Sequence, residues 1–249
     1  MKEPFTDNRT DFIINLANLK SKDSILTVGV AHIPEIERKI ENKVMNCNCI
    51  DIDLNKLNHA KRYLKKTNLI YGDITNPDDF VTLSSGLVNR HSRKKTSNWN
   101  VYITKLDKKL TDKFDTIIML EVLEHIEDDF KTLKNINNML KRGGKLIISV
   151  PNKHPLHVIN PVRYTQHKRH YSMTQITNIL KKAGFSINYT NTVESPKLLF
   201  DLYVHLFFKY LLRKTVPFGI LTGKKDKTYL KNNLESSGLD SLVVATKDI

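Results

Sequence analysis

Cysteine is scarce in this chain, in which Cys47 and Cys49 are the only two among 249 residues. They lie two positions apart in a predicted strand, so both side chains point the same way, and neighbours at this spacing do not form a structural disulfide. The sequence also lacks a C-x-x-C pair, which excludes the usual cysteine spacing of a zinc site. These absences are typical of a reducing compartment, and we expect a cytoplasmic protein.

Long hydrophobic runs and acidic residues are also in short supply. The first 12 residues contain no apolar core of a signal peptide, and no unbroken apolar run approaches the roughly 18 residues of a membrane span. Lysine and arginine number 40 against 26 acidic residues, which gives a net charge of +14. This excess favours an anionic partner such as RNA, a membrane surface or a phosphorylated substrate. A composition that is simply rich in lysine is equally consistent, because the lysines are spread along the whole chain.

Apolar runs alternate with amphipathic segments in the order expected of a doubly wound sheet. The length suits one α/β domain with additions. We therefore predict a Rossmann-like α/β fold with a mostly parallel seven-stranded sheet and a terminal antiparallel strand. We expect an N-terminal helix within 1–20 and one domain over 21–249, with insertions at about 74–113 and 195–235. The predicted strands are 24–29, 44–53, 68–73, 114–120, 145–150, 185–191 and 241–247, and the predicted helices include 10–20, 35–42, 55–66 and 172–184.

The most informative stretch is 114–152, which contains two buried strands joined by a helix and a Gly-Gly turn. Glu121, Glu124 and His125 follow the first of these strands. Ligands of open α/β sheets sit beyond the carboxyl ends of the strands, so polar residues there are placed for chemistry. The phrases F-D, E-V-L-E-H-I and L-K-x-G-G-x-L-I-I-S-V-P-N in this order closely resemble the second half of a class I S-adenosylmethionine-dependent methyltransferase. The resemblance implies that fold and S-adenosylmethionine as cofactor, and it favours the O-methyltransferases that act on small molecules such as quinone precursors.

The resemblance extends to the first predicted strand, where the family has the motif D/E-x-G-x-G-x-G. Its glycines let the backbone approach the methionine part of the cofactor closely. Here Gly29 matches the first glycine, whereas Ala31 and Ile33 take the places of the other two, and Thr27 replaces the acid. Two interpretations stay open: a working cofactor loop with one extra methyl group at Ala31, or a non-catalytic domain that serves as a scaffold.

Further cofactor contacts are implied at the ends of the next two strands. The resemblance makes Asp51 the acceptor for both ribose hydroxyls, and a carboxylate suits this role because it offers two acceptor oxygens. Asp73 would meet the adenine amino group, with Ile52 and Ile74 beside the ring. Simpler roles remain open, since Asp51 or Asp53 could cap the following helix and an aspartate after a strand is a common turn residue.

The E-x-x-E-H cluster is open to two chemical interpretations. In some O-methyltransferases and small-RNA 2′-O-methyltransferases a matching cluster binds a metal, which implies Glu121, Glu124, His125 and the downstream His167 as ligands of Mg²⁺ or another divalent ion. His170 competes with His167 for the fourth position. Without a metal, Glu121 lines the cofactor pocket and His125 or His167 acts as general base, because imidazole exchanges protons near neutral pH.

A last feature is the apolar segment 198–212, whose polar residues recur every four positions at Asp201, His205 and Lys209. On a helix they would form one narrow stripe. Such a helix over 198–213 could pack on the sheet, cover the active site, form a dimer interface or lie in a membrane surface. A peripheral membrane or protein partner is therefore one expectation for this segment.

Taken together, these patterns predict a methyltransferase that O-methylates a small, lipid-linked or saccharide-linked hydroxyl compound. Two alternatives remain: an RNA 2′-O-methyltransferase, favoured by the basic charge, and a non-catalytic scaffold subunit, favoured by the altered glycine loop. We find no basic motif interleaved with aromatic residues that would indicate an RNA-binding module.

Overall fold

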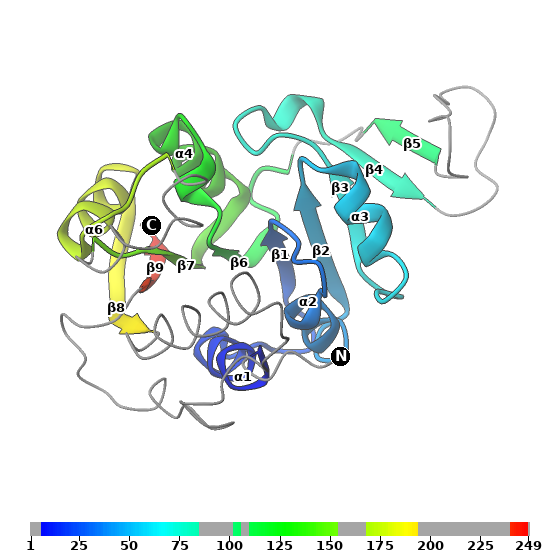
Figure 1. The fold of residues 1–249 in the computed structure, drawn as a ribbon, viewed down its shortest axis with the longest axis horizontal. Helices are drawn as coiled ribbons and strands as arrows, with labels where there is room; N and C mark the ends of the chain where they lie inside the picture. Colours follow the sequence, from blue (N-terminus) through cyan, green and yellow to red (C-terminus); the bar gives the residue numbers. More distant parts are fainter. Residues whose placement is uncertain (1–5, 85–101, 106–109, 154–167, 194–239, 249) are drawn as a thin grey trace, which may run out of the picture.

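A nine-stranded sheet forms the centre of the molecule in the computed structural model, with the order β5-β4-β3-β2-β1-β6-β7-β9-β8 (Figure 1). The structure describes residues 6–84, 102–105, 110–153, 168–193 and 240–248. The strands are β1 (Ser24–Val28), β2 (Asn46–Asp51), β3 (Asn68–Tyr71), β4 (Val81–Ser84), β5 (Tyr102–Lys105), β6 (Phe114–Leu120), β7 (Leu140–Pro151), β8 (Phe185–Val193) and β9 (Asp240–Lys247).

The five central strands, from β3 to β7 in the sheet order, are parallel, and antiparallel strands follow on both sides. All seven predicted strands are present, and β9 lies antiparallel between β7 and β8. This confirms the Rossmann-like fold class. The sequence analysis missed β4 and β5, which form an antiparallel pair at the far edge of the sheet within the predicted 74–113 insertion.

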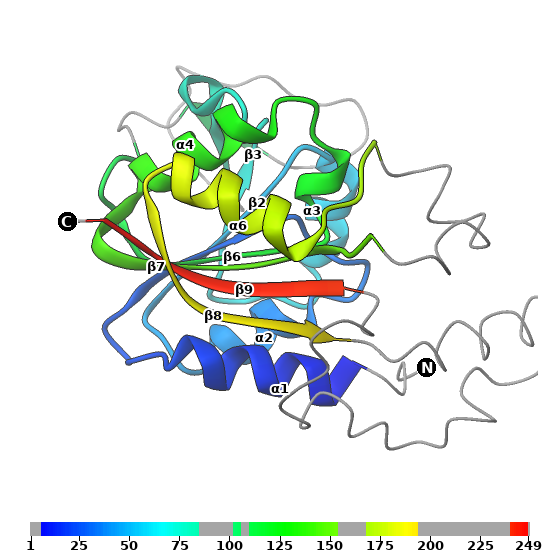
Figure 2. The ribbon, with the colours of Figure 1, turned by 90° about the vertical axis from the view of Figure 1, so that its left-hand side faces the viewer.

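Helices cover both faces of the sheet, and Figure 2 shows α1 (Thr6–Ala17) and α2 (Glu35–Ile40) on one face with α4 (Asp129–Met139) and α6 (Met173–Lys182) on the other. A third helix, α3 (Leu54–Ala60), packs on β2 and β3. It lies on the α2 side, because Cys47 and Cys49 share one face of β2 and contact the α1–α2 cluster and the α3 cluster respectively. Both thiols are buried and unbonded.

Helix α1 is part of the main fold rather than an appended arm. Ile13, Ile14 and Ala17 are buried in one cluster with Ile118 of β6 and Ile147 of β7. The helix begins at Thr6 and ends at Ala17, earlier than the predicted 10–20 at both ends. As a result, the N-terminal turns of α1 reach the edge of the sheet at which the parallel strands end.

Short capping motifs set where several helices begin. The Asp53 side chain accepts hydrogen bonds from the backbone N–H groups of Asn55 and Lys56 and so caps α3, as one interpretation of the sequence expected. Ser172 and Gln175 form a complete capping box at the start of α6.

The Gly-Gly turn predicted before the second buried strand is instead an irregular beginning of β7. Gly143 has a φ of +69°, and the pairing with β6 shifts register between Phe114 and Thr116. The left-handed conformation explains the glycine at position 143, since other residues rarely adopt it.

No helix of the described residues is long and apolar enough to cross a membrane. The predicted 198–213 helix, the 195–235 insertion and His167 lie outside the described residues. The expectations attached to them remain predictions.

Candidate functional site

A cavity of about 1010 Å³ opens at the carboxyl ends of β1, β2, β3 and β6, next to the point where the sheet order reverses. Open α/β sheets bind their ligands at this place. The cavity brings together every cofactor-binding residue that the sequence analysis proposed, although these come from four separate segments of the chain. They are Gly29, Ala31, Asp51, Ile52, Asp73, Ile74 and Glu121.

The loop after β1 needs a glycine at only one of its three motif positions. Gly29 has a φ of +81°, and a Cβ atom there would lie 2.5 Å from Val122 Cγ2. Among the described residues, only Asn18, Asp112 and Glu121 have a positive φ without being glycine. Ala31 and Ile33 therefore adopt backbone conformations that any residue tolerates, and the loss of two glycines leaves the loop unstrained.

Asp51 holds this loop in place. Its Oδ2 accepts a hydrogen bond of 2.7 Å from the backbone N–H of Val30, and its Oδ1 accepts one of 2.7 Å from the N–H of Asp53. The side chain is largely buried and lines the cavity. A carboxylate oxygen can accept more than one hydrogen bond, so both oxygens retain acceptor capacity for a ligand.

Two apolar residues and one aspartate border the cavity beyond Asp51. Ile52 is 64% exposed, which is unusual for a large aliphatic side chain, whereas Ile74 is buried. Asp73 is exposed, and one of its oxygens accepts a hydrogen bond from the N–H of Thr75, so it stabilises a turn while it lines the cavity. An exposed isoleucine in a cavity offers a flat apolar contact to a ring.

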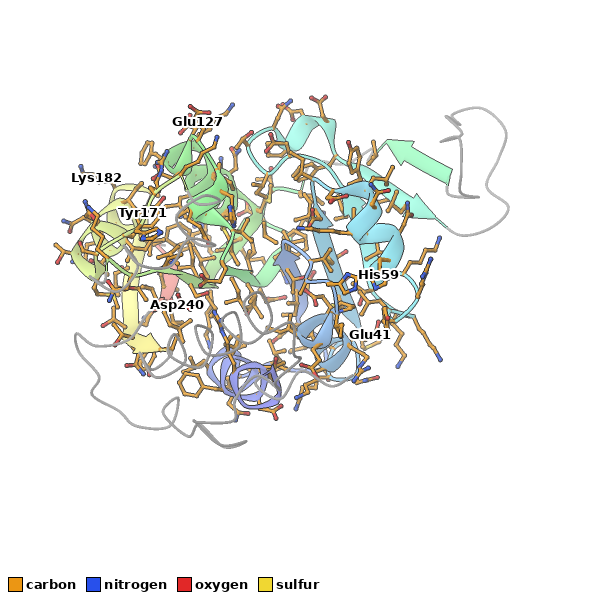
Figure 3. All side chains as sticks on the ribbon, viewed as in Figure 1. Glu41, His59, Glu127, Tyr171, Lys182 and Asp240 are labelled. Atoms are coloured by element: carbon orange, nitrogen blue, oxygen red, sulfur yellow. The ribbon has the colours of Figure 1, made fainter. Side chains whose placement is uncertain are left out.

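Glu121 has a strained backbone, and one oxygen of its carboxylate is engaged by two side chains. Its φ is +52°, directly after β6. Its Oε1 accepts a hydrogen bond of 2.7 Å from the Ser149 hydroxyl and lies 3.4 Å from Nη2 of Arg9. Arg9 also reaches Ser149 at 3.0 Å and lies 3.9 Å from Asp240, which is labelled in Figure 3. The left-handed conformation of a non-glycine residue at a cavity is typical of a functional position.

Glu124 and His125, the other two residues of the E-x-x-E-H cluster, point in different directions. A 3₁₀ turn over Leu123–His125 places the Glu124 side chain in the interior, where it is fully buried, and places the His125 ring at the cavity, where 44% of it is exposed. The His125 Nε2 lies 3.8 Å from Glu124 Oε1. Among the described residues no group of three histidine, cysteine or acidic side chains is arranged to hold a metal ion. The predicted metal site is therefore unsupported, because Glu121 is turned toward Arg9 and Ser149.

The segment that follows His167, the predicted fourth metal ligand, is anchored beside the cavity. The backbone N–H of Lys168 donates to the Glu124 carbonyl at 3.0 Å, and Lys168 lines the cavity. Arg169 Nη1 lies 2.6 Å from Asp129 Oδ2, to which Tyr171 also donates a hydrogen bond. Burial and the neighbouring Asp129 raise the pKa of the Tyr171 phenol well above its ordinary value.

Arg9 and Glu37 are among the charged residues of the cavity that were not predicted from the sequence. Arg9 gave no signal, because its contacts are made to residues more than 100 positions away. The helical pattern does give a signal for Glu37. It lies three positions before the buried Ile40, on the inward face of the helix that follows the glycine loop. A glutamate on a buried helix face calls for an explanation.

These features fit S-adenosylmethionine, the cofactor that the sequence resemblance implies. A cavity of this size can hold a nucleoside with an amino-acid tail. Asp51 offers acceptors for ribose hydroxyls, Ile52 and Ile74 an apolar border for a base, and Gly29 a backbone without a Cβ that would crowd the ligand.

Comparisons with known proteins agree with this assignment. Residues 10–190 match the model of a protein family described as a methyltransferase domain. No curated protein matches the sequence.

Solved structures share the fold at low sequence identity. A putative methyltransferase from Bacillus halodurans has a TM-score of 0.63 and 12% identity, covering 97% of this chain and 100% of that one. A putative sarcosine dimethylglycine methyltransferase from Galdieria sulphuraria has a TM-score of 0.61 and 12% identity, with 98% and 85% covered. Phosphoethanolamine N-methyltransferase 2 from Haemonchus contortus, in complex with S-adenosyl-L-methionine, has a TM-score of 0.60 and 18% identity, with 98% and 53% covered.

The family match spans most of the chain and includes the cavity from Gly29 to Lys168. The fold, the position of the cavity and this match lead to one conclusion. The chain belongs to the methyltransferase-domain family, and it is an S-adenosylmethionine-dependent methyltransferase.

Proposed function

We propose that this methyltransferase transfers the methyl group to the oxygen of a small, lipid-linked or saccharide-linked hydroxyl compound, with His125 as the general base. The observation that carries the proposal is the position of His125, half-exposed at the cofactor cavity and backed by the buried Glu124. When bound, S-adenosylmethionine supplies an electrophilic methyl group on a sulfonium.

An oxygen acceptor explains why a base would be placed here. A hydroxyl group is a weak nucleophile until its proton is removed, whereas a neutral amine attacks through its own lone pair. The His125 ring can take this proton, and the Glu124 carboxylate 3.8 Å away can orient the ring and stabilise the imidazolium that forms. Most of the remaining rate enhancement would come from positioning the acceptor and excluding water.

Cofactor binding is tested first, by calorimetric titration of the full chain with S-adenosylhomocysteine. We expect micromolar binding that Asp51→Ala weakens by at least tenfold, because the mutation removes the proposed ribose acceptor and releases the Val30 backbone. Asp53→Asn is the matched control, since asparagine retains the oxygen that caps α3 and Asp53 does not line the cavity. Absence of binding to the unmodified chain would contradict the cofactor assignment.

The base is tested by turnover with S-adenosylmethionine carrying a labelled methyl group. The acceptor panel contains catechols, polyprenylated hydroquinones, saccharides, primary amines and a short oligoribonucleotide. We expect label on a hydroxyl compound, and His125→Ala to lower kcat by roughly 10²- to 10⁴-fold while the affinity for S-adenosylhomocysteine is retained. Labelling of amines alone would contradict O-methylation, and labelling of the oligonucleotide would favour the RNA alternative.

Partners and location follow from the acceptor. A lipid-linked acceptor would bring the protein to a membrane surface from the cytoplasm, and the basic charge of +14 would favour such contact. This part of the proposal predicts that the protein sediments with vesicles containing anionic lipid and is released by high salt.

A further inference from the structure

Helix α2 places a carboxyl group against the cofactor cavity that nothing in the family motif accounts for. Glu37 is 1% exposed and lines the cavity. Its Oε2 has no hydrogen-bond partner among the described residues. Burying a polar group without partners is unfavourable, and burying an unpaired charge is more so. A carboxyl group kept in this state therefore calls for a ligand.

Among the described residues no cation pairs with this group. Within the described part of the chain no ion pair reaches Glu37, while the nearby basic residues are engaged elsewhere: Lys39 pairs with Asp11 at 3.0 Å, and Arg9 pairs with Glu121. Thr27 lies beside Glu37 and lowers its pKa as a hydrogen-bond donor, while the Thr27 hydroxyl also donates to the Asn48 carbonyl at 3.5 Å. Thr27 stands where the family motif has an acid, so α2 brings a carboxyl group to the position from which β1 lacks one.

We propose that Glu37 binds the α-ammonium group of the cofactor's methionine part. This inference rests on S-adenosylmethionine being the cofactor, and it assigns the end of that molecule opposite to the adenine. In this arrangement Asp51 holds the ribose and Ile52 borders the base. The glycine loop, whose Val30 N–H donates to Asp51, leads from β1 into α2. A ligand that extends from Asp51 along the loop reaches the carboxyl group of Glu37 with its amino-acid tail.

The surroundings of Glu37 link the binding of the ammonium group to the release of a proton. Burial raises the pKa of Glu37 to about 7, a hydrogen bond from Thr27 opposes the shift, and the Asp51 charge adds to it. The buried Cys47 and Cys49 thiols of β2 also face this group. On the side of α2 that faces α1, Lys39 forms an ion pair with Asp11 of α1. A cationic ligand favours the carboxylate over the neutral acid, so binding near pH 7 releases a proton from Glu37.

Three ligands separate the parts of the cofactor. S-adenosylmethionine carries both the ammonium and the sulfonium charge, S-adenosylhomocysteine carries the ammonium alone as its cation, and 5′-methylthioadenosine has neither. Calorimetric titration of the full chain at pH 7 in phosphate and in Tris buffer measures the affinity and, from the difference in heat, the protons released.

We expect S-adenosylhomocysteine to release about half a proton near pH 7 and 5′-methylthioadenosine to release none. Glu37→Gln should weaken S-adenosylhomocysteine by roughly 10- to 100-fold and abolish the release, because it removes a charge-assisted hydrogen bond. The same variant should bind 5′-methylthioadenosine within about twofold of the unmodified chain, which also shows that it is folded. Asp11→Asn, at an exposed carboxylate of the neighbouring helix α1 that does not line the cavity, is the control and should keep both properties.

Three results would overturn the proposal. The first is an unchanged affinity and proton release in Glu37→Gln, and the second is an equal loss in Asp11→Asn. The third is an equal loss of 5′-methylthioadenosine binding, which would assign Glu37 to the nucleoside or to folding. If neither adenosine compound binds the unmodified chain, the cofactor assignment itself fails and this inference falls with it, a pattern distinct from the other three.

Discussion

A residue that is placed to bind the cofactor can lower the stability of the fold. Glu37 does so because it is a buried carboxyl group whose protonation changes with pH. Burial raises its pKa from an ordinary value of 4.5 to about 7. Between these two pH values the folded chain keeps the proton that the unfolded chain has lost. The free energy of unfolding therefore falls as the pH rises from about 4.5 to about 7 and then stays at its lower value.

We predict that Glu37→Gln stabilises the protein at pH 8 and has little effect at pH 5. Glutamine resembles the neutral acid, so the variant avoids the ionisation of a buried group, which is worth at most about 3 kcal/mol here. Urea unfolding followed by circular dichroism at both pH values measures the difference. Parallel pH profiles for the two proteins would show that Glu37 does not titrate in this range.

Gly29 is the one position of the altered loop at which glycine is required. We expect Gly29→Ala to cost about 1–3 kcal/mol of stability, because alanine is strained at a φ of +81° and its Cβ would press on Val122. The affinity for S-adenosylhomocysteine should fall with it, since Val122 borders the cavity. Ala31→Gly is the control and should leave the affinity within about threefold. A larger effect at Ala31 would contradict the geometry of the loop.

At the scale of elements, the cavity depends on contacts that fix α2 and the loop before β3. Glu41, which follows α2 and is labelled in Figure 3, accepts hydrogen bonds from the backbone N–H groups of Lys65, Lys66 and Thr67 and from the Thr67 hydroxyl. The carboxylate is buried. It therefore ties the end of one helix to the entry of the neighbouring strand.

We predict that Glu41→Ala lowers the free energy of unfolding by roughly 1–3 kcal/mol, since three partly buried backbone donors lose their acceptor. Glu41→Gln keeps one acceptor oxygen and should cost about half as much. Thermal and urea unfolding measure both variants. Equal stability of Glu41→Ala and the unmodified chain would mean that water replaces the carboxylate.

For the whole molecule, the cofactor cavity is assembled from α1, α2 and the ends of four strands, so ligand binding should stabilise the entire fold. At a concentration 100-fold above its Kd, S-adenosylhomocysteine should add about 2.7 kcal/mol and raise the Tm by roughly 5–10 °C. Asp51→Ala should abolish most of this shift at the same ligand concentration. Scanning calorimetry with and without ligand tests it, and a shift of equal size in Asp51→Ala would place the ligand elsewhere.

Much of the fold was predictable because it depends on local patterns. Most central strands are largely apolar, and the connections between them are long enough for a helix, which favours parallel pairing. The predicted cofactor residues follow the same logic, since polar residues after parallel strands meet at one edge. Strands β4 and β5 escaped prediction because their short polar sequences become strands only by pairing with β3 and with each other.

The position of a site residue was predictable where that residue follows a strand. The direction in which its side chain points was not. E-V-L-E-H placed Glu121, Glu124 and His125 near one another, but a positive φ and a 3₁₀ turn send their side chains in different directions. This rotation separates Glu121 from the other two and removes the basis for the predicted metal site within the described residues.

The sequence by itself determined the order of strands and helices, the edge at which the cavity opens and the family, because all three follow from hydrophobic periodicity and ordered motifs. Only the tertiary structure decided that Arg9 binds Glu121 and that Glu37 is buried beside Thr27, with no cation paired to it in the described part of the chain. These pairings join distant segments, and their burial and charge depend on how helices α1 and α2 pack on the sheet, which no local pattern specifies.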